Sequence, residues 1–96
     1  MTRINREVVL DTAARAVNGS RNEDYGEPYN DFCRVAQMWS AAFDHFFTPE
    51  DVAKALILLK VGRLCESPNH FDSWVDIAGY SACGWDAYQD GMDEQA

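Results

Sequence analysis

Hydrophobic residues recur every three or four positions over residues 28–46, which is the clearest pattern in the sequence. On an α-helix, side chains with this spacing share one face, so the pattern predicts an amphipathic helix whose apolar stripe packs on other helices. The predicted helix begins near Pro28. Its apolar stripe consists of Phe32, Val35, Ala36, Trp39, Phe43 and Phe46.

Three further segments have helical spacing, and none has the strict alternation that is typical of a β-strand. We predict helices over residues 3–18, 49–65 and 71–88, with Gly19 ending the first and the Pro68 region separating the last two. Residues 91–96 are predicted to form a frayed acidic tail. The fold class is therefore all-α, a four-helix bundle built from one domain of residues 1–96.

The predicted helix over residues 49–65 differs from the others because apolar residues cover nearly its whole circumference. Thr48 is a suitable N-cap, Pro49 suits the first helical position, and two acids follow in the first turn. A helix that is apolar all round is normally buried all round. A 96-residue monomer can hardly bury one. We therefore expect this helix to lie centrally in a dimer or tetramer.

The charge and cysteine content restrict the partners and the compartment. The formal net charge of −8 disfavours nucleic acids and membrane surfaces as partners, because both require a basic footprint. The three cysteines, Cys33, Cys65 and Cys83, do not fit a disulfide framework or a zinc site. The N-terminus has no signal-peptide pattern, and no apolar run approaches the length of a membrane span. We expect a cytoplasmic protein.

Lys60 and Arg63 are the most informative polar residues, because they lie three positions apart on the apolar helix. An unpaired buried charge is costly, so an anion is expected to meet these cations unless they reach solvent. Acids of the last helix could supply that anion. A bound phosphate could also supply it, and the guanidinium group suits phosphate well.

Asp72 and Asp76 lie four positions apart on one face of the last helix, and Tyr80 continues that face. Paired carboxylates suit Mg²⁺, but they suit ion pairs with Lys60 and Arg63 equally well. The three tryptophans fit helical stripes and are expected to be mostly core residues. Trp74 is the expected exception, because it neighbours both aspartates.

The loop before the second helix supplies Arg21, Asp24 and Tyr25, a combination that suits a phosphate, a sugar hydroxyl and a base face. Such a loop is also compatible with a plain surface connection. Asn69 and His70, at the start of the last helix, complete the predicted ligand contacts. The sequence contains no P-loop, no G-x-G-x-x-G motif and no nucleophile elbow.

Several motifs in fixed order resemble a family of small phage and prophage proteins. These are R-x-x-D-Y-G (21–26), Trp39, T-P-E-D-V-A (48–53), L-L-K-x-x-R-L (58–64) and P-N-H-x-D-S-W-V-D-I-A-G-Y (68–80), and they span roughly residues 7–84. The family looks similar to phage nucleotide-modification-associated domains. More distantly, it resembles the MazG-like all-α nucleoside triphosphate pyrophosphohydrolases, which are dimeric or tetrameric helical bundles.

The MazG-like enzymes hold Mg²⁺ with an E-x-x-E pair on one helix and an E-x-x-D pair on the next. This sequence has no E-x-x-E in its second or third helix, and Asp72 and Asp76 echo the second pair only with a different spacing. The resemblance therefore implies a MazG-like bundle with a nucleotide-type ligand, and the missing metal-binding acids favour binding over hydrolysis.

Three hypotheses follow. The first is a phage-type protein that sequesters a nucleotide or nucleotide-derived signal in a cationic pocket, without a cofactor, as a counter-defence sponge in the cytoplasm of the infected host. Its predicted contacts are Arg21, Asp24, Tyr25, Lys60, Arg63, Asn69, His70, Trp74 and Tyr80. The second is a Mg²⁺-dependent pyrophosphohydrolase with Asp72 and Asp76 as metal ligands. The third is an acidic protein-interaction module.

Overall fold

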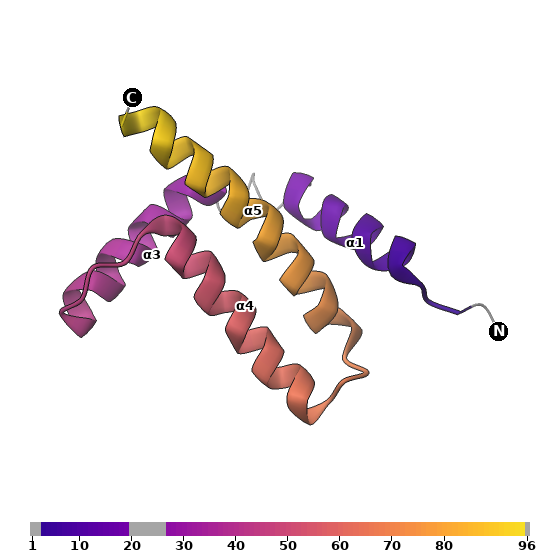
Figure 1. The fold of residues 1–96 in the computed structure, drawn as a ribbon. Helices are drawn as coiled ribbons and strands as arrows, with labels where there is room; N and C mark the ends of the chain where they lie inside the picture. Colours follow the sequence, from indigo (N-terminus) through magenta and orange to yellow (C-terminus); the bar gives the residue numbers. More distant parts are fainter. Residues whose placement is uncertain (1–2, 20–26, 96) are drawn as a thin grey trace.

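The computed structural model describes residues 3–19 and 27–95, and within these ranges it contains helices and no strand. The four helices are α1 (Arg6–Asn18), α3 (Pro28–Phe43), α4 (Pro49–Glu66) and α5 (Phe71–Gln95), shown in Figure 1. The all-helical, four-helix prediction is confirmed for the described part of the chain.

Side-chain caps set where two helices begin. The Asn5 Oδ1 atom accepts hydrogen bonds from the backbone amides of Glu7 and Val8, so α1 begins at Arg6 and not at residue 3 as predicted. Before α4, the Asp51 amide donates to the Thr48 hydroxyl at 3.2 Å, and the Thr48 amide donates to the Asp51 carboxylate at 3.0 Å. This reciprocal capping box confirms Thr48 as the N-cap and Pro49 as the first helical residue.

The end of α3 lies three residues before the predicted end at Phe46. Asp44 adopts a left-handed backbone conformation with a φ of 50°, which ends the helix at Phe43. The Ser40 hydroxyl donates to the Ala36 carbonyl and accepts from the Phe47 amide at 3.0 Å, which ties the following loop back onto α3.

The predicted end of the last helix at residue 88, with a frayed tail after it, is wrong. Helix α5 continues through Gly91 to Gln95. Ala87 is fully buried in the core, and Gly91 lies against the Tyr29 ring of α3, 3.8 Å from where a Cβ atom would stand. Packing on α3 therefore supports the helix past a residue that often ends helices.

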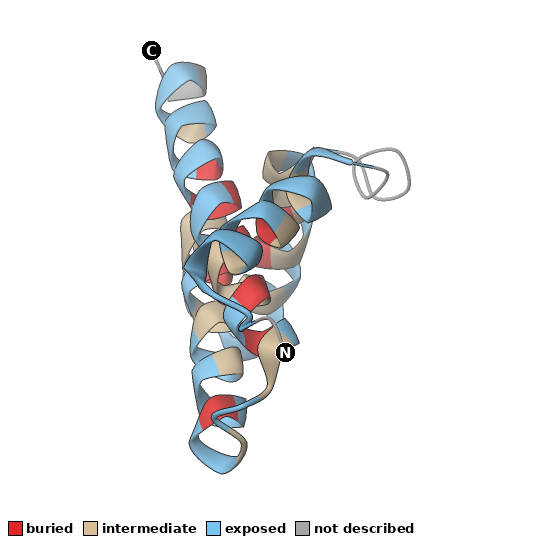
Figure 2. Cartoon of the chain, turned by 90° about the vertical axis from the view of Figure 1, so that its right-hand side faces the viewer, coloured by how far each residue is buried: buried red, intermediate tan, exposed pale blue. Residues whose placement is uncertain are grey.

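The helices α4 and α5 form an antiparallel hairpin with the most extensive contact in the chain. Helix α1 packs on α5 alone, and α3 crosses the hairpin near the start of α4 (Figure 1). The core lies where α3 meets the hairpin and consists of Phe32, Ala36, Val52, Ala53, Cys83 and Ala87. Most of the remaining helical surface is exposed (Figure 2).

The molecule is more extended than a typical globular domain of its length. Its radius of gyration is 14.7 Å, whereas about 13 Å is typical of a 100-residue globular domain. The composition of α4 predicted burial all round. Within this one chain, however, Leu58, Leu59 and Val61 of α4 are exposed. Among the described residues, no helix combines the length and hydrophobicity that crossing a bilayer requires.

Candidate functional site

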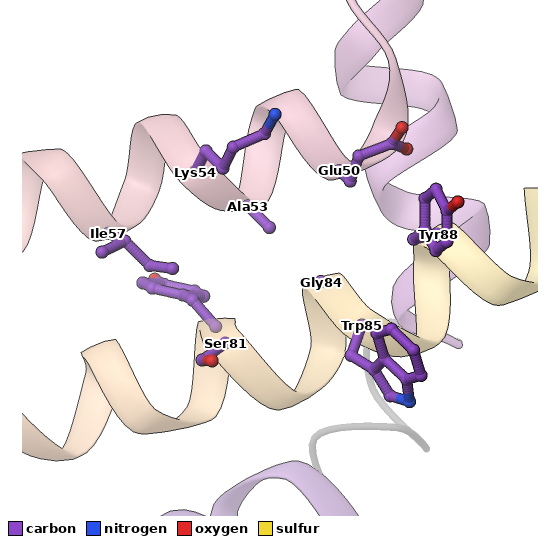
Figure 3. A pocket seen from close by; sticks show the side chains of 9 residues that line it. Glu50, Ala53, Lys54, Ile57, Ser81, Gly84, Trp85 and Tyr88 are labelled. Carbon is purple, nitrogen blue, oxygen red and sulfur yellow. The ribbon is translucent and has the colours of Figure 1, made fainter.

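A groove of about 320 Å³ runs between α4 and α5 (Figure 3). Helix α4 contributes side chains spaced three or four residues apart, and α5 contributes the facing set with the same spacing. The residues that line the groove are Glu50, Ala53, Lys54 and Ile57 of α4, and Tyr80, Ser81, Gly84, Trp85 and Tyr88 of α5.

The floor of the groove exists because two small residues let the helices approach closely. A Cβ atom built on Gly84 would stand 2.8 Å from the Ala53 Cβ atom, which is closer than real Cβ atoms come. Ala53 and Gly84 are both buried, whereas larger side chains on either side form the walls. The groove is therefore narrow at its base and open toward solvent.

One wall of the groove is aromatic. The rings of Trp85 and Tyr88 stack, with centroids 6.1 Å apart and an interplanar angle of 28°. Trp85 is 59% exposed, so the prediction that it belongs to the core is wrong. Stacked, exposed aromatic faces offer a surface on which a planar ring system can lie.

The opposite wall carries charge. The Lys54 ammonium lies 3.2 Å from the Asp51 carboxylate one turn earlier, and both groups are solvent-accessible. The hydrogen bond from the Thr48 backbone amide lowers the pKa of Asp51 below its usual value. Asp51 is therefore committed to the helix cap, and Lys54 is the cation that an anionic ligand would meet in the groove.

The two cations predicted to form one clamp are differently placed. The Lys60 Nζ atom lies 3.0 Å from the Asp76 Oδ2 atom across the hairpin, and the Lys60 side chain is only 17% exposed. Arg63 is exposed. An acid of the last helix thus already meets Lys60, which is the structural alternative that the sequence left open.

The metal alternative also depends on Asp76. Asp72 is exposed, and one oxygen of Asp76 is held by Lys60. Among residues 3–19 and 27–95, no group of three or more histidine, cysteine, aspartate or glutamate side chains is placed to hold a metal ion. Mg²⁺ at this position would have to share the Asp76 carboxylate with the Lys60 ammonium.

Residues at the α4–α5 turn form local contacts. The His70 Nδ1 atom lies 2.6 Å from the hydroxyl of Ser73, which is fully buried. The Trp74 indole donates to the Pro68 carbonyl at 2.9 Å, and Asn69 is exposed beside it. These contacts fix the turn.

Of the predicted ligand contacts, Tyr80 lines the groove. Arg21, Asp24 and Tyr25 lie outside the described residues. The groove residues Glu50, Lys54, Trp85 and Tyr88 were not among the predicted contacts. Their three- and four-residue spacing places them on one face of each helix, which the sequence does indicate. The spacing does not indicate whether another helix covers that face.

Comparison with known proteins identifies the family. Residues 8–88 match the family model described as "Domain of unknown function (DUF6378)". The chain is 46% identical over 74 residues to the Gene 55 protein of Mycobacterium phage L5. The aligned segment covers 76% of this chain and 47% of that relative. The chain is 36% identical over 77 residues to the Gene 55 protein of Mycobacterium phage D29, covering 80% of this chain and 51% of that relative.

The chain thus spans about half the length of the curated relatives that it matches. No solved structure matches it significantly. The resemblance to phage proteins is confirmed, because both relatives are phage proteins. The chain belongs to the DUF6378 family.

Proposed function

We propose that this protein captures a small nucleotide-type molecule in the groove between α4 and α5 without cleaving it. The observation that carries the proposal is a groove of about 320 Å³ with aromatic rings on one wall and a lysine on the other. This volume lies at the lower end of the roughly 300–1,000 Å³ that small-molecule sites occupy.

The two walls supply complementary chemistry for such a ligand. The exposed faces of Trp85 and Tyr88 suit a nucleobase, and base–aromatic stacking contributes about 1–3 kcal/mol per base. Lys54 suits a phosphate on the opposite side. Its ion pair with Asp51 is exposed, and such surface pairs contribute only about 0–1 kcal/mol, so a phosphate could replace Asp51 at small cost.

The arrangement of the acids supports capture over hydrolysis. In the enzyme alternative, Asp72 and Asp76 would hold Mg²⁺, yet Lys60 already neutralises Asp76 at 3.0 Å. Breaking that pair would leave a largely buried ammonium without its partner, which is costly. We therefore place the pyrophosphohydrolase second.

The nucleotide class comes from the resemblance to phage nucleotide-modification-associated domains, together with membership of a family that contains phage proteins. A phage protein that holds a nucleotide without converting it would withhold that molecule from the host, as a counter-defence sponge does. Arg63 is exposed but lies nine positions from Lys54, roughly 180° around α4, so it does not face the groove.

The test is calorimetric titration of the purified protein with linear and cyclic nucleotides. We expect saturable binding, recovery of the unchanged nucleotide after heating, and no pyrophosphate when Mg²⁺ is added. Trp85→Ala should weaken binding by about tenfold or more through loss of stacking, and Lys54→Ala should weaken it in proportion to the phosphate charge.

Leu59→Ala is the matched control, because Leu59 is an exposed large apolar residue of α4 that does not line the groove. Binding that is insensitive to Trp85→Ala and Lys54→Ala would refute the groove as the site. Mg²⁺-dependent release of pyrophosphate would favour the enzyme instead.

A further inference from the structure

The open side of the α4–α5 hairpin carries exposed apolar side chains around the groove, with Glu50 and Lys54 between them on α4; we call this surface the groove face. Along α4, Leu58 and Val61 follow Lys54 at intervals of four and three residues and extend that wall of the groove. Along α5, large side chains lie before, within and after the groove. The exposed apolar residues of the groove face are Leu58, Val61, Trp74, Trp85, Tyr88 and Met92.

The α5 side of the groove face has the spacing of a helix-packing seam. Positions 74, 78, 81, 85, 88 and 92 alternate between intervals of four and three residues. Such a stripe normally lies against another helix. None of these six positions is acidic, although the chain carries 16 acids and a net charge of −8. Two copies of an acidic chain would repel each other at most other surfaces, and this stripe avoids that repulsion.

No helix of the described chain covers the groove face. Helix α3 shares a core with Val52 and Ala53 of α4 and with Cys83 and Ala87 of α5, and of these four only Ala53, at the floor, lines the groove. Val52 and Cys83 each lie two positions from a groove residue, Lys54 and Trp85 respectively, which is roughly 200° around the helix. Thus α3 occupies the opposite side of the hairpin, and α1 contacts α5 alone.

We infer that a second copy of this chain docks on the groove face, so that two α4–α5 hairpins pack face to face in a symmetric dimer. The six exposed apolar residues of the groove face together expose on the order of 600 Å² per copy, if aromatic side chains offer about 200 Å² each. Stable interfaces bury about 800 Å² per partner, which the surrounding rim would complete.

The intrachain core points to the same occupant. Its members are mostly small, and the largest fully buried side chains are Val52 and Ser73. Many large apolar residues lie on the surface, although Phe32 is buried, and this distribution is expected when part of the core forms between subunits. The dimer would cover the groove, including the rings of Trp85 and Tyr88. This inference rests on the groove face alone and does not depend on the proposed ligand.

The test is sedimentation equilibrium of the full chain without nucleotide, over a wide range of micromolar concentrations. We expect a mass twice the 10.8 kDa of one chain. Leu58→Glu should weaken the dimer at least 100-fold, because it places a charge within the apolar contact of both copies.

Leu59→Glu is the matched control. Leu59 is the next residue, is 61% exposed against 68% for Leu58, and points roughly 100° away around α4. It should leave the dimer intact, and circular dichroism should show both variants folded. A wild-type monomer at every concentration would overturn the inference, as would equal weakening by both substitutions. Because the dimer covers Trp85 and Tyr88, nucleotide titration of the Leu58→Glu variant tests the ligand proposal with those rings free.

Discussion

Individual residues decide how closely α4 and α5 approach. Gly84 and Ala53 leave no room for an additional methyl group between the helices, because a Cβ atom at position 84 would stand 2.8 Å from the Ala53 Cβ atom. Gly62 is the opposite case on α4, with no atom within 4 Å of its would-be Cβ atom. The same substitution should therefore have opposite effects at the two positions.

Gly84→Ala should lower the free energy of unfolding by about 1–3 kcal/mol, because the helices must separate to admit the methyl group. Gly62→Ala should raise it by up to about 1 kcal/mol through helix propensity alone. Urea denaturation measures both. Ala53→Gly in the Gly84→Ala background should recover most of the loss. Similar effects at the two glycines would contradict the close helix contact.

Residue types also limited what the sequence could predict about the site. The expectation that Lys60 would meet an anion is fulfilled by Asp76, one of the two explanations left open. The position of Trp85 was mispredicted, because an apolar stripe looks the same whether a helix of the same chain covers it or solvent does.

At the scale of the helices, local signals predicted well and tertiary contacts did not. The start of α4 follows from its capping box, which is encoded within four residues. The ends of α3 and α5 depend on the left-handed conformation of Asp44 and on the contact between Gly91 and Tyr29. Neither is visible in the spacing of hydrophobic residues.

The capping box should make α4 sensitive to acid. The backbone hydrogen bond from Thr48 lowers the pKa of Asp51 in the folded protein, so folding favours the ionised carboxylate. Its stabilising contribution is full above the ordinary value of 3.8 and is lost as the pH falls through the lower folded-state pKa. Asp51→Ala should cost about 0.5–2 kcal/mol at neutral pH, as cap losses do.

Asp51→Asn is the comparison that isolates ionisation, because an amide oxygen accepts the same hydrogen bond without titrating. Between about pH 5 and pH 3, the wild type should lose stability relative to Asp51→Asn, as followed by urea denaturation at each pH. Parallel losses in the two proteins would show that the carboxylate of Asp51 makes no such contribution.

At the scale of the whole molecule, the chain is built unevenly about the hairpin. Helix α3 and the core lie on one side, and the apolar groove face lies on the other. A 96-residue chain has little interior to spare, so leaving large side chains outside weakens it as a monomer. Stability and association should therefore be coupled.

The midpoint of thermal unfolding should rise with protein concentration, by about 3–4 °C per tenfold increase for a dimer of this size. Leu58→Glu should unfold at a lower temperature that does not depend on concentration. Scanning calorimetry over a hundredfold range of concentration measures this. A wild-type midpoint that does not move would mean that folding gains nothing from association.

The ion pair between Lys60 and Asp76 has a mechanical consequence for the hairpin. Small residues such as Ala53 and Gly84 allow close contact between the helices but offer no long side chain that interlocks across it. The Lys60–Asp76 ion pair, further along the helices, opposes a shift of α5 along α4 by one helical turn, about 5.4 Å. It thereby keeps the lysine of one wall opposite the aromatic rings of the other, although it touches neither.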